Sequence, residues 1–563
     1  MRLRLTVVLG VLIFPLLAQA QPLADRVPAD AILYVGWQGT DSLGPGYDKS
    51  HLKAVLDSSN LPQLLTQCLP QLLQRLQAQD PQSAQQVKAV ADLLTSLSRY
   101  PSAVFFAGID FQAPGMPRPR LVLLCRAGQD GDAVLAQFND LIGKMQGSPF
   151  PVQAVRQAND VALTLGYEPN VNPLAGQGAV KPISSDDRLK QALAQVNKDP
   201  VAMVYADAEA LQKLADQTVE FGGDPNVQAL WPKIRDALGL AGAKRLIWTA
   251  GFDDGDWSTQ VFLAAPAPRV GLLTLVENKP ISDDALRLVP QSATWMAACR
   301  LDLARITTTL RTVAGGIDPQ AQQGVDMALG VAQLALALNL QKDLFEPLGD
   351  EWVVYNDANT AGQGPLGTVL VNRLRKPAEA QRALSRIELF TDNMVNAQLL
   401  RLKLRLSFEQ VKIGDLTVHY AVLPLASPSW AIKDGNLYVA MYPQAIIAAT
   451  AQAASTSAKS ILDNEGFQAL RKRLGAPSAA SISFMDLPRA ADQSYQKLLL
   501  LSQVGLGAAD MAGIKTPPVV IPPLAKLKEN LAPAGCVSWT DDVGWHMKTV
   551  APFPFSRLLG LMP

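Results

Sequence analysis

The sequence is short of the residues that most often bind metals. Its 563 residues include three histidines and four cysteines. His51, His419 and His546 lie far apart, and no paired Cys/His spacing occurs, so a zinc site is not expected. Four cysteines are also too few for the disulfide framework of small secreted proteins. We therefore predict no metal-binding residues.

A surplus of charge is also missing. Lys and Arg number 50, Asp and Glu number 50, and the formal net charge is 0. Such a chain has no electrostatic footprint for nucleic acid or for an anionic membrane. Hydrophobic residues at 48% and charged residues at 18% are typical of a folded globular protein. We predict a folded protein with no nucleic-acid partner.

The motifs of catalysis and cofactor binding are absent or incomplete. Residues 513–516 (Gly-Ile-Lys-Thr) lack the earlier glycine of a phosphate loop and run into two prolines. Two Ser-x-x-Lys tetrads, 50–53 and 494–497, lack the partner motifs of penicillin-binding enzymes. The acidic run 253–256 lacks the ligand spacing of a calcium loop and is expected to be a solvated hairpin tip. We therefore predict no catalytic residues and no cofactor-binding residues.

Only one long apolar run is present, and it lies at the start of the chain. Arg2 and Arg4 precede the run 5–17, and Ala18-Gln19-Ala20 forms a small-x-small site. This pattern predicts a signal peptide, residues 1–20, that is cleaved after Ala20. An uncleaved N-terminal anchor is the alternative. With no second long apolar run, we expect no stable membrane span after cleavage and an extracytoplasmic location, either periplasmic or secreted.

Two stretches of the remaining chain follow the same plan. A proline and a strand-like run open each of them, at 28–37 and at 290–299. Helical sequence, strands, a helix, a hairpin and a closing hairpin then follow in the same order. The paired segments are 103–109 and 351–355, 120–126 and 368–373, 132–145 and 377–400, 152–167 and 430–442, 189–207 and 467–486, and 248–257 and 536–545. We predict an internal duplication with halves at 21–278 and 279–563.

The turn signals select the fold class. Asp434-Gly435 is a strong hairpin turn, and a further hairpin is expected at 408–423 in the second half. Hairpins break the strict strand–helix alternation that a parallel sheet requires. We therefore predict an α+β fold of two tandem related halves, each a mainly antiparallel sheet covered by helices.

The alignment of the two halves places Cys299 and Cys536 where the first half has tryptophans. If the first and last strands of the second half are neighbours, these two cysteines could form a disulfide. Two buried free thiols are the alternative, because unpaired cysteine is often buried. We expect Cys68 and Cys125 to be core residues.

Three segments resemble a known group of sequences: Val27-Pro-Ala-Asp30, the run 348–352 (Leu-Gly-Asp-Glu-Trp) and the run 434–437 (Asp-Gly-Asn-Leu). They are similar to a domain-of-unknown-function family of exported bacterial proteins. The start of the chain, 27–37 with 50–53, also resembles secreted proteins of planctomycete-type bacteria. The resemblance implies an envelope location and no established activity, and it carries over no functional residues.

We expect a non-enzymatic binding or scaffold protein of the cell envelope, with a protein or glycan partner. One alternative is an envelope-acting hydrolase whose carboxylate site the sequence does not locate. The other is a carrier of an apolar ligand. A scaffold should expose an apolar or aromatic patch, with Trp257 and Trp545 as candidates, whereas an enzyme should show convergent titratable groups with perturbed pKa values.

Overall fold

The computed structural model describes residues 23–556 of the chain, with short internal gaps. The gaps are 64–66, 68–70, 72–90, 114–115, 145–147, 170, 175–179, 198, 362–364, 393–406, 424–425, 456, 476–477, 512 and 514–517. The expected signal peptide, Cys68 and much of the helical sequence after residue 61 lie outside the described residues.

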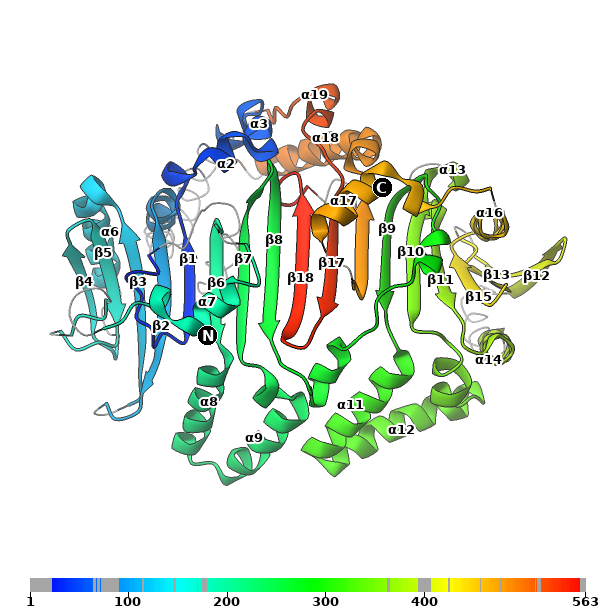
Figure 1. Ribbon diagram of the computed structural model, residues 1–563, viewed down its shortest axis with the longest axis horizontal. Helices are drawn as coiled ribbons and strands as arrows, with labels where there is room; N and C mark the ends of the chain where they lie inside the picture. The colour runs from blue at the N-terminus through cyan, green and yellow to red at the C-terminus, as the bar shows by residue number, and fades with distance from the viewer. Residues whose placement is uncertain are drawn as a thin grey trace.

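The described strands form one antiparallel sheet of 18 strands (Figure 1). The pairings place them in the following order from one edge to the other: β4 (Val152–Gln157), β5 (Asp160–Leu165), β3 (Arg118–Arg126), β2 (Ser102–Asp110), β1 (Leu33–Trp37), β6 (Ala202–Asp207), β7 (Arg245–Asp253), β8 (Asp256–Ala264), β18 (Gly544–Ala551), β17 (Ala534–Thr540), β16 (Ser481–Met485), β9 (Ala293–Arg300), β10 (Glu351–Asp357), β11 (Thr368–Arg373), β15 (Asn436–Ala440), β14 (Ser429–Lys433), β13 (Leu416–Val422) and β12 (Ser407–Ile413). The predicted α+β class with an antiparallel sheet is confirmed.

The two parts of the chain have the same strand order when each is followed from the outer edge of the sheet to its centre. Read inward, the first part has the order β4-β5-β3-β2-β1-β6-β7-β8, and the second has β14-β15-β11-β10-β9-β16-β17-β18. The hairpin β12–β13 is extra and extends the outer edge of the second part. At the centre, β8 pairs with β18, with Gln260 opposite Lys548. The strands therefore join into one continuous sheet, whereas the sequence suggested a separate sheet for each half.

Helices cover both faces and both strand ends of the sheet (Figure 1). Their bounds are α2 (Pro45–Asp48), α3 (His51–Asp57), α6 (Gly131–Lys144), α7 (Asp187–Leu193), α8 (Ala208–Gly222), α9 (Pro225–Leu238), α10 (Asp283–Arg287), α11 (Leu303–Ile317), α12 (Pro319–Leu336), α13 (Ala358–Ala361), α14 (Pro377–Phe390), α16 (Pro443–Ala454), α17 (Glu465–Leu474), α18 (Leu487–Met511) and α19 (Leu524–Lys528). Helices α7, α10, α16 and α17 pack on one face over the two largest apolar clusters. Helices α6 and α14 pack on the other face.

The remaining helices join the two parts of the chain at the ends of the strands. At one end, Val55 of α3 packs with Leu487 of α18 and Leu527 of α19. At the opposite end, α9 contacts α11. No described helix is long and apolar enough to cross a membrane.

Local sequence signals explain several element boundaries. Asp434 and Gly435 both have positive φ, 50° and 76°, as a tight turn between β14 and β15 requires. Asp207 ends β6 and accepts a hydrogen bond from the backbone N–H of Ala210 at the start of α8. Pro377 occupies the first turn of α14, where its missing N–H has no helical partner to lose.

The predicted bond between Cys299 and Cys536 is wrong. Strand β16 lies between the strands that carry the two cysteines, with Ser481 opposite Cys299 and Ser483 opposite Cys536. Neighbouring strands lie about 4.8 Å apart, so the two Cα atoms are roughly 10 Å apart or more, beyond the ~7 Å that a disulfide spans. Both thiols are free. Cys125 is buried, as expected for a core residue.

Candidate functional site

Each of the three histidines is paired with a carboxylate. His51 Nδ1 lies 2.8 Å from Asp256 Oδ1, and His546 Nε2 lies 3.1 Å from Asp541 Oδ2. His419 Nδ1 lies 3.1 Å from Glu388 Oε1, and its ring stacks on Trp430. No serine hydroxyl is bonded to any of these imidazoles within the described part of the chain. The pairs therefore lack the nucleophile that a Ser-His-Asp site requires.

The two Ser-x-x-Lys tetrads serve helix structure. The Ser50 hydroxyl caps α3 by accepting a hydrogen bond from the Lys53 N–H at 3.1 Å, while Lys53 Nζ donates to Asp57 at 2.6 Å. The buried Ser494 hydroxyl donates to the Ala490 carbonyl of its own helix at 2.9 Å. Neither serine is bonded to its lysine side chain, so neither tetrad is arranged for proton transfer.

The acidic turn between β7 and β8 is a structural contact, and the expectation of a solvated tip is wrong for Asp256. Its carboxylate is buried and pairs with both Arg473 of α17 and His51 of α3. Arg473 Nη2 also donates to the Asp253 carbonyl at 3.0 Å. A buried carboxylate needs such partners to offset its lost hydration, so this turn ties the two parts of the chain together.

Other acidic groups are engaged in the same way. Glu351 is buried and pairs with Arg300 at 2.9 Å and Arg373 at 3.0 Å, and Asp350 pairs with Arg300 at 3.1 Å. These carboxylates are held by guanidinium groups and form no acid/base couple. The described residues contain no group of three His, Cys, Asp or Glu side chains that could hold a metal ion.

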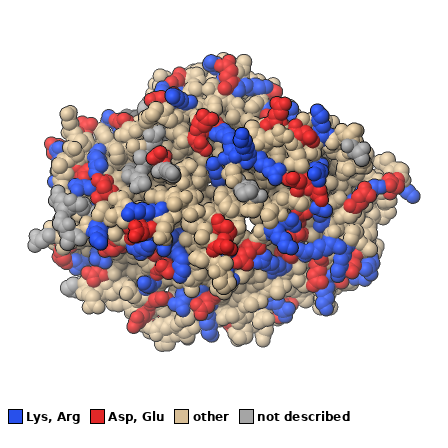
Figure 2. Space-filling view, viewed as in Figure 1, with Lys and Arg blue, Asp and Glu red and all other residues tan. Residues whose placement is uncertain are grey.

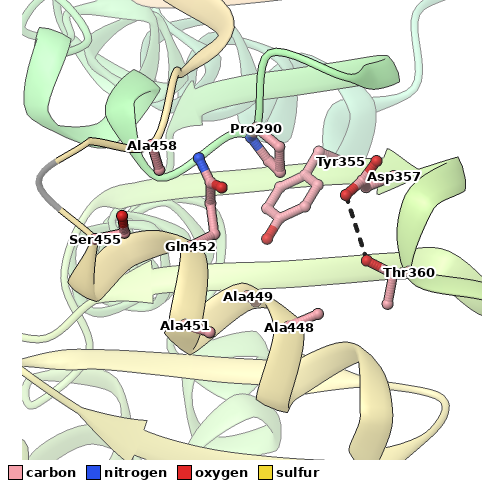
Figure 3. A pocket seen from close by; sticks show the side chains of 10 residues that line it. All are labelled: Pro290, Tyr355, Asp357, Thr360, Ala448, Ala449, Ala451, Gln452, Ser455 and Ala458. Atoms are coloured by element: carbon pink, nitrogen blue, oxygen red, sulfur yellow. Dashed lines mark hydrogen bonds between the residues drawn. The ribbon is translucent and has the colours of Figure 1, made fainter.

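A pocket of about 310 Å³ lies beside the end of β10 in the second part of the chain (Figure 3). Its wall is formed by β10, α13, α16 and the segment that follows α16. The α16 side of the pocket is lined by Ala448, Ala449 and Ala451. Their small side chains leave the space that larger residues would fill. Polar groups come from Tyr355, Asp357, Thr360, Gln452 and Ser455.

Tyr355 is the most unusual residue of this pocket. It is 1% exposed within an apolar cluster, and its hydroxyl has no hydrogen-bond partner among the described residues. The hydroxyl points toward α16, between Gln452 and Ala449 (Figure 3). Burial, followed by the nearby charges of Tyr438 and Asp357, raises the pKa of this phenol. The group therefore stays protonated and can both donate and accept a hydrogen bond.

Asp357 ends β10 on the other side of the Tyr355 ring (Figure 3). Its Oδ1 accepts hydrogen bonds from the Ser292 hydroxyl at 2.9 Å and the Asn359 N–H at 3.1 Å. Its Oδ2 accepts one from the Thr360 hydroxyl at 3.3 Å. The carboxylate thus caps the four-residue helix α13 and also lines the pocket.

Gln452 closes the pocket from α16. Its side-chain Nε2 donates to the Lys459 carbonyl at 2.9 Å, which holds the segment after the helix in place. That bond orients the amide and leaves its Oε1 as an acceptor with no partner among the described residues. Donor and acceptor groups therefore face the same space from two elements distant in sequence.

The first part of the chain lacks an equivalent hydroxyl. Tyr355 pairs with Met296 of β9, and the corresponding position in β2 is Phe105, which pairs with Tyr34 of β1. Phe105 is fully buried and carries no polar atom. The pocket chemistry is thus particular to the second part of the chain.

Sequence reasoning did not find these pocket residues. Tyr355 follows the ordinary alternation of a buried strand, and Gln452 is one of several polar residues in an alanine-rich helix. Asp357 follows the same pattern as Asp207, because each is an aspartate that ends a strand and caps the next helix. Nothing local to these segments indicates that they share one cavity.

The surface of the protein has mixed charge and exposes apolar side chains on two helices. Lys and Arg are interspersed with Asp and Glu over the face shown in Figure 2, and no large area there carries one sign of charge. Helix α12 exposes Met327, Val331 and Leu334 along one side, and α18 exposes Leu500 and Val504. Of the two tryptophans named as candidates for surface exposure, Trp257 is buried and Trp545 is half-buried.

A scan against protein-family models and searches of curated proteins and of solved structures found no match to this chain.

Proposed function

We propose that this chain is a non-enzymatic binding protein of the cell envelope that takes a small polar ligand in the pocket beside Tyr355. The observation that carries the proposal is the buried hydroxyl of Tyr355, a residue of the pocket wall, which has no partner among the described residues. Leaving such a group unsatisfied costs about 1–3 kcal/mol. A ligand that hydrogen-bonds to this hydroxyl would offset that cost, so the bound state is favoured.

The size of the pocket limits the ligand. At about 310 Å³ it lies at the lower end of the roughly 300–1,000 Å³ typical of small-molecule sites. A monosaccharide or a smaller compound fits this volume. The polar groups of the wall favour a hydrogen-bonding molecule over a lipid, so the pocket does not support the carrier of an apolar ligand.

The pocket residues also favour binding over catalysis. Asp357 is engaged by two hydroxyls and a backbone N–H, and Tyr355 has a raised pKa that keeps it from acting as a base near neutral pH. The Thr360 hydroxyl donates to the Asp357 carboxylate that caps α13, and the described residues that line the pocket include no histidine or lysine to complete a nucleophile–base pair. A hydrolase in the envelope would require such a pair.

We further propose that the protein is exported, as its N-terminal segment and its family resemblance suggest, and that it arose by duplication. The shared strand order supports the duplication.

The test is a ligand screen on the purified protein with matched variants. A panel of neutral sugars, polyols, amino sugars, amino alcohols and amino acids would be screened by thermal unfolding against wild type, Tyr355→Phe and Tyr438→Phe. Tyr438 lies in the same apolar cluster but outside the pocket lining. We expect at least one compound to raise Tm for wild type and Tyr438→Phe but not for Tyr355→Phe, because a ligand at 100 times its Kd adds about 2.7 kcal/mol. A panel with no such compound refutes the proposal.

A second candidate function is the docking of a protein partner on the apolar stripe of α12. Met327, Val331 and Leu334 share one side of that helix at i, i+4 and i+7 spacing, and all three are exposed. Replacing Val331 and Leu334 with Glu should abolish cross-linking to an envelope protein that wild type and Tyr355→Phe both capture. Equal capture by all three forms would exclude this surface.

A further inference from the structure

All but one of the buried acidic residues in the described part of the chain pair with a basic side chain. Six acidic residues in the described part of the chain are less than a tenth exposed: Asp160, Asp207, Asp256, Glu351, Asp357 and Glu388. Four of them pair with arginine (Asp160, Asp207, Asp256 and Glu351), and Glu388 pairs with His419 at 3.1 Å. Asp357, which is 7% exposed, has no such partner among the described residues.

The exception coincides with the pocket. Asp357 is the one member of this buried acidic set that lines the cavity beside Tyr355. Its three hydrogen bonds come from neutral donors, Ser292, Asn359 and Thr360, which orient the carboxylate but supply no opposite charge. Burying an ionised carboxylate without a cation is costly, and for four of the other five buried acids this chain supplies an arginine. The missing charge is therefore expected to come from the pocket side.

We propose that the ligand of this pocket is a small cationic amine that also carries a hydrogen-bonding hydroxyl or carbonyl, such as an amino sugar or an amino alcohol. This inference rests on the proposed binding function and names its ligand class. The ammonium group binds the Asp357 carboxylate, and the Gln452 Oε1 offers a second acceptor. The Tyr355 hydroxyl binds the oxygen of the ligand.

The Asp357 carboxylate, the Gln452 oxygen and the Tyr355 hydroxyl together explain why we propose an amine that also carries an oxygen group. An ammonium ion has three donors and no acceptor, so it matches the Asp357 carboxylate, which only accepts hydrogen bonds. A charge-assisted hydrogen bond to a carboxylate is about twice as strong as a neutral one. Two ligand groups are required because Asp357 and Gln452 lie on opposite sides of the Tyr355 ring (Figure 3).

The test compares compounds that differ in one group. Binding of D-glucosamine and D-glucose, and of ethanolamine and ethylene glycol, is measured by titration calorimetry on the full protein. The variants are Asp357→Asn, which keeps an acceptor for the Asn359 N–H, and Asp318→Asn as the control. Asp318 caps α12 through the N–H two residues on, as Asp357 caps α13, but it lies outside the pocket lining.

We expect one of the amines to bind wild type and Asp318→Asn at least about tenfold more tightly than its neutral counterpart, and Asp357→Asn to lose this preference. A preference that survives in Asp357→Asn overturns the inference. Equal binding of amine and neutral compound, lost in Tyr355→Phe, overturns the inference but leaves the proposed binding function standing. If neither pair binds, the inference fails, and the proposed function then depends on whether the wider panel contains a Tyr355-dependent ligand.

Discussion

Replacing Tyr355 with phenylalanine should stabilise the unliganded protein, although most substitutions of buried residues destabilise. The substitution removes a buried hydroxyl that has no partner among the described residues. Relief of its desolvation is worth about 1–3 kcal/mol, and the lost dispersion contacts of one oxygen are worth about 0.1–0.2 kcal/mol per atom pair. We therefore expect the free energy of unfolding to rise by about 1 kcal/mol.

The assay is urea unfolding of wild type, Tyr355→Phe and Tyr438→Phe in the absence of ligand, compared at the transition midpoints. Tyr438 is equally buried in the same cluster, but its hydroxyl is not among the buried side-chain atoms that lack a partner. Removing that hydroxyl relieves no such cost, so Tyr438→Phe should be unchanged or destabilised by up to about 1.5 kcal/mol, and only Tyr355→Phe should be stabilised. A destabilised Tyr355→Phe would show that its hydroxyl is satisfied in the free protein, and the argument for a ligand would fail.

Three further predictions concern the join between the two parts of the chain. Arg473→Met leaves the buried carboxylate of Asp256 with His51 as its remaining partner, and we expect the free energy of unfolding from chemical denaturation to fall by roughly 3 kcal/mol. A fall of less than about 1 kcal/mol would mean that this contact behaves like a surface ion pair. Burial lowers the pKa of the His546 imidazole in the folded protein below the ordinary histidine value of about 6.5, so the free energy of unfolding should fall as the pH drops below that value. The decrease in the free energy of unfolding between pH 7 and pH 5 should therefore be smaller in His546→Gln than in wild type. An identical pH profile in the two proteins would contradict this. Gly544→Ala places a Cβ 2.2 Å from the Leu263 carbonyl oxygen, where β18 pairs with β8, and should destabilise the protein by about 1–3 kcal/mol. Gly505→Ala lies on α18 with no atom close to the added Cβ, so it should be neutral or stabilising. Similar Tm shifts in the two variants would refute the packing argument.

Much of the fold was predictable because its signals are local. The β14–β15 hairpin follows from Asp434-Gly435, whose positive φ angles suit that pair of residues, and the start of α14 follows from Pro377. The paired segments seen in the sequence also lie at corresponding positions of the sheet. Trp257 and Trp545, for example, are each the second residue of the second strand of a closing hairpin.

The candidate site was not predictable in the same way. Its carboxylate, phenol and amide come from segments about 95 residues apart, at Asp357, Tyr355 and Gln452. None of them belongs to a motif. Unlike the other buried acids, Asp357 has no arginine or histidine beside it among the described residues, and that is a property of its surroundings.

The sequence by itself determined which segments are strands and helices and where many of them turn, because alternation, capping and turn chemistry act over a few residues. Only the tertiary structure decided which distant strands pair. It placed β16 between β9 and β17, which separates Cys299 from Cys536, and it joined β8 to β18 at the centre. Such pairings depend on burying whole sheet faces against helices, so they are set by the packing of the complete chain.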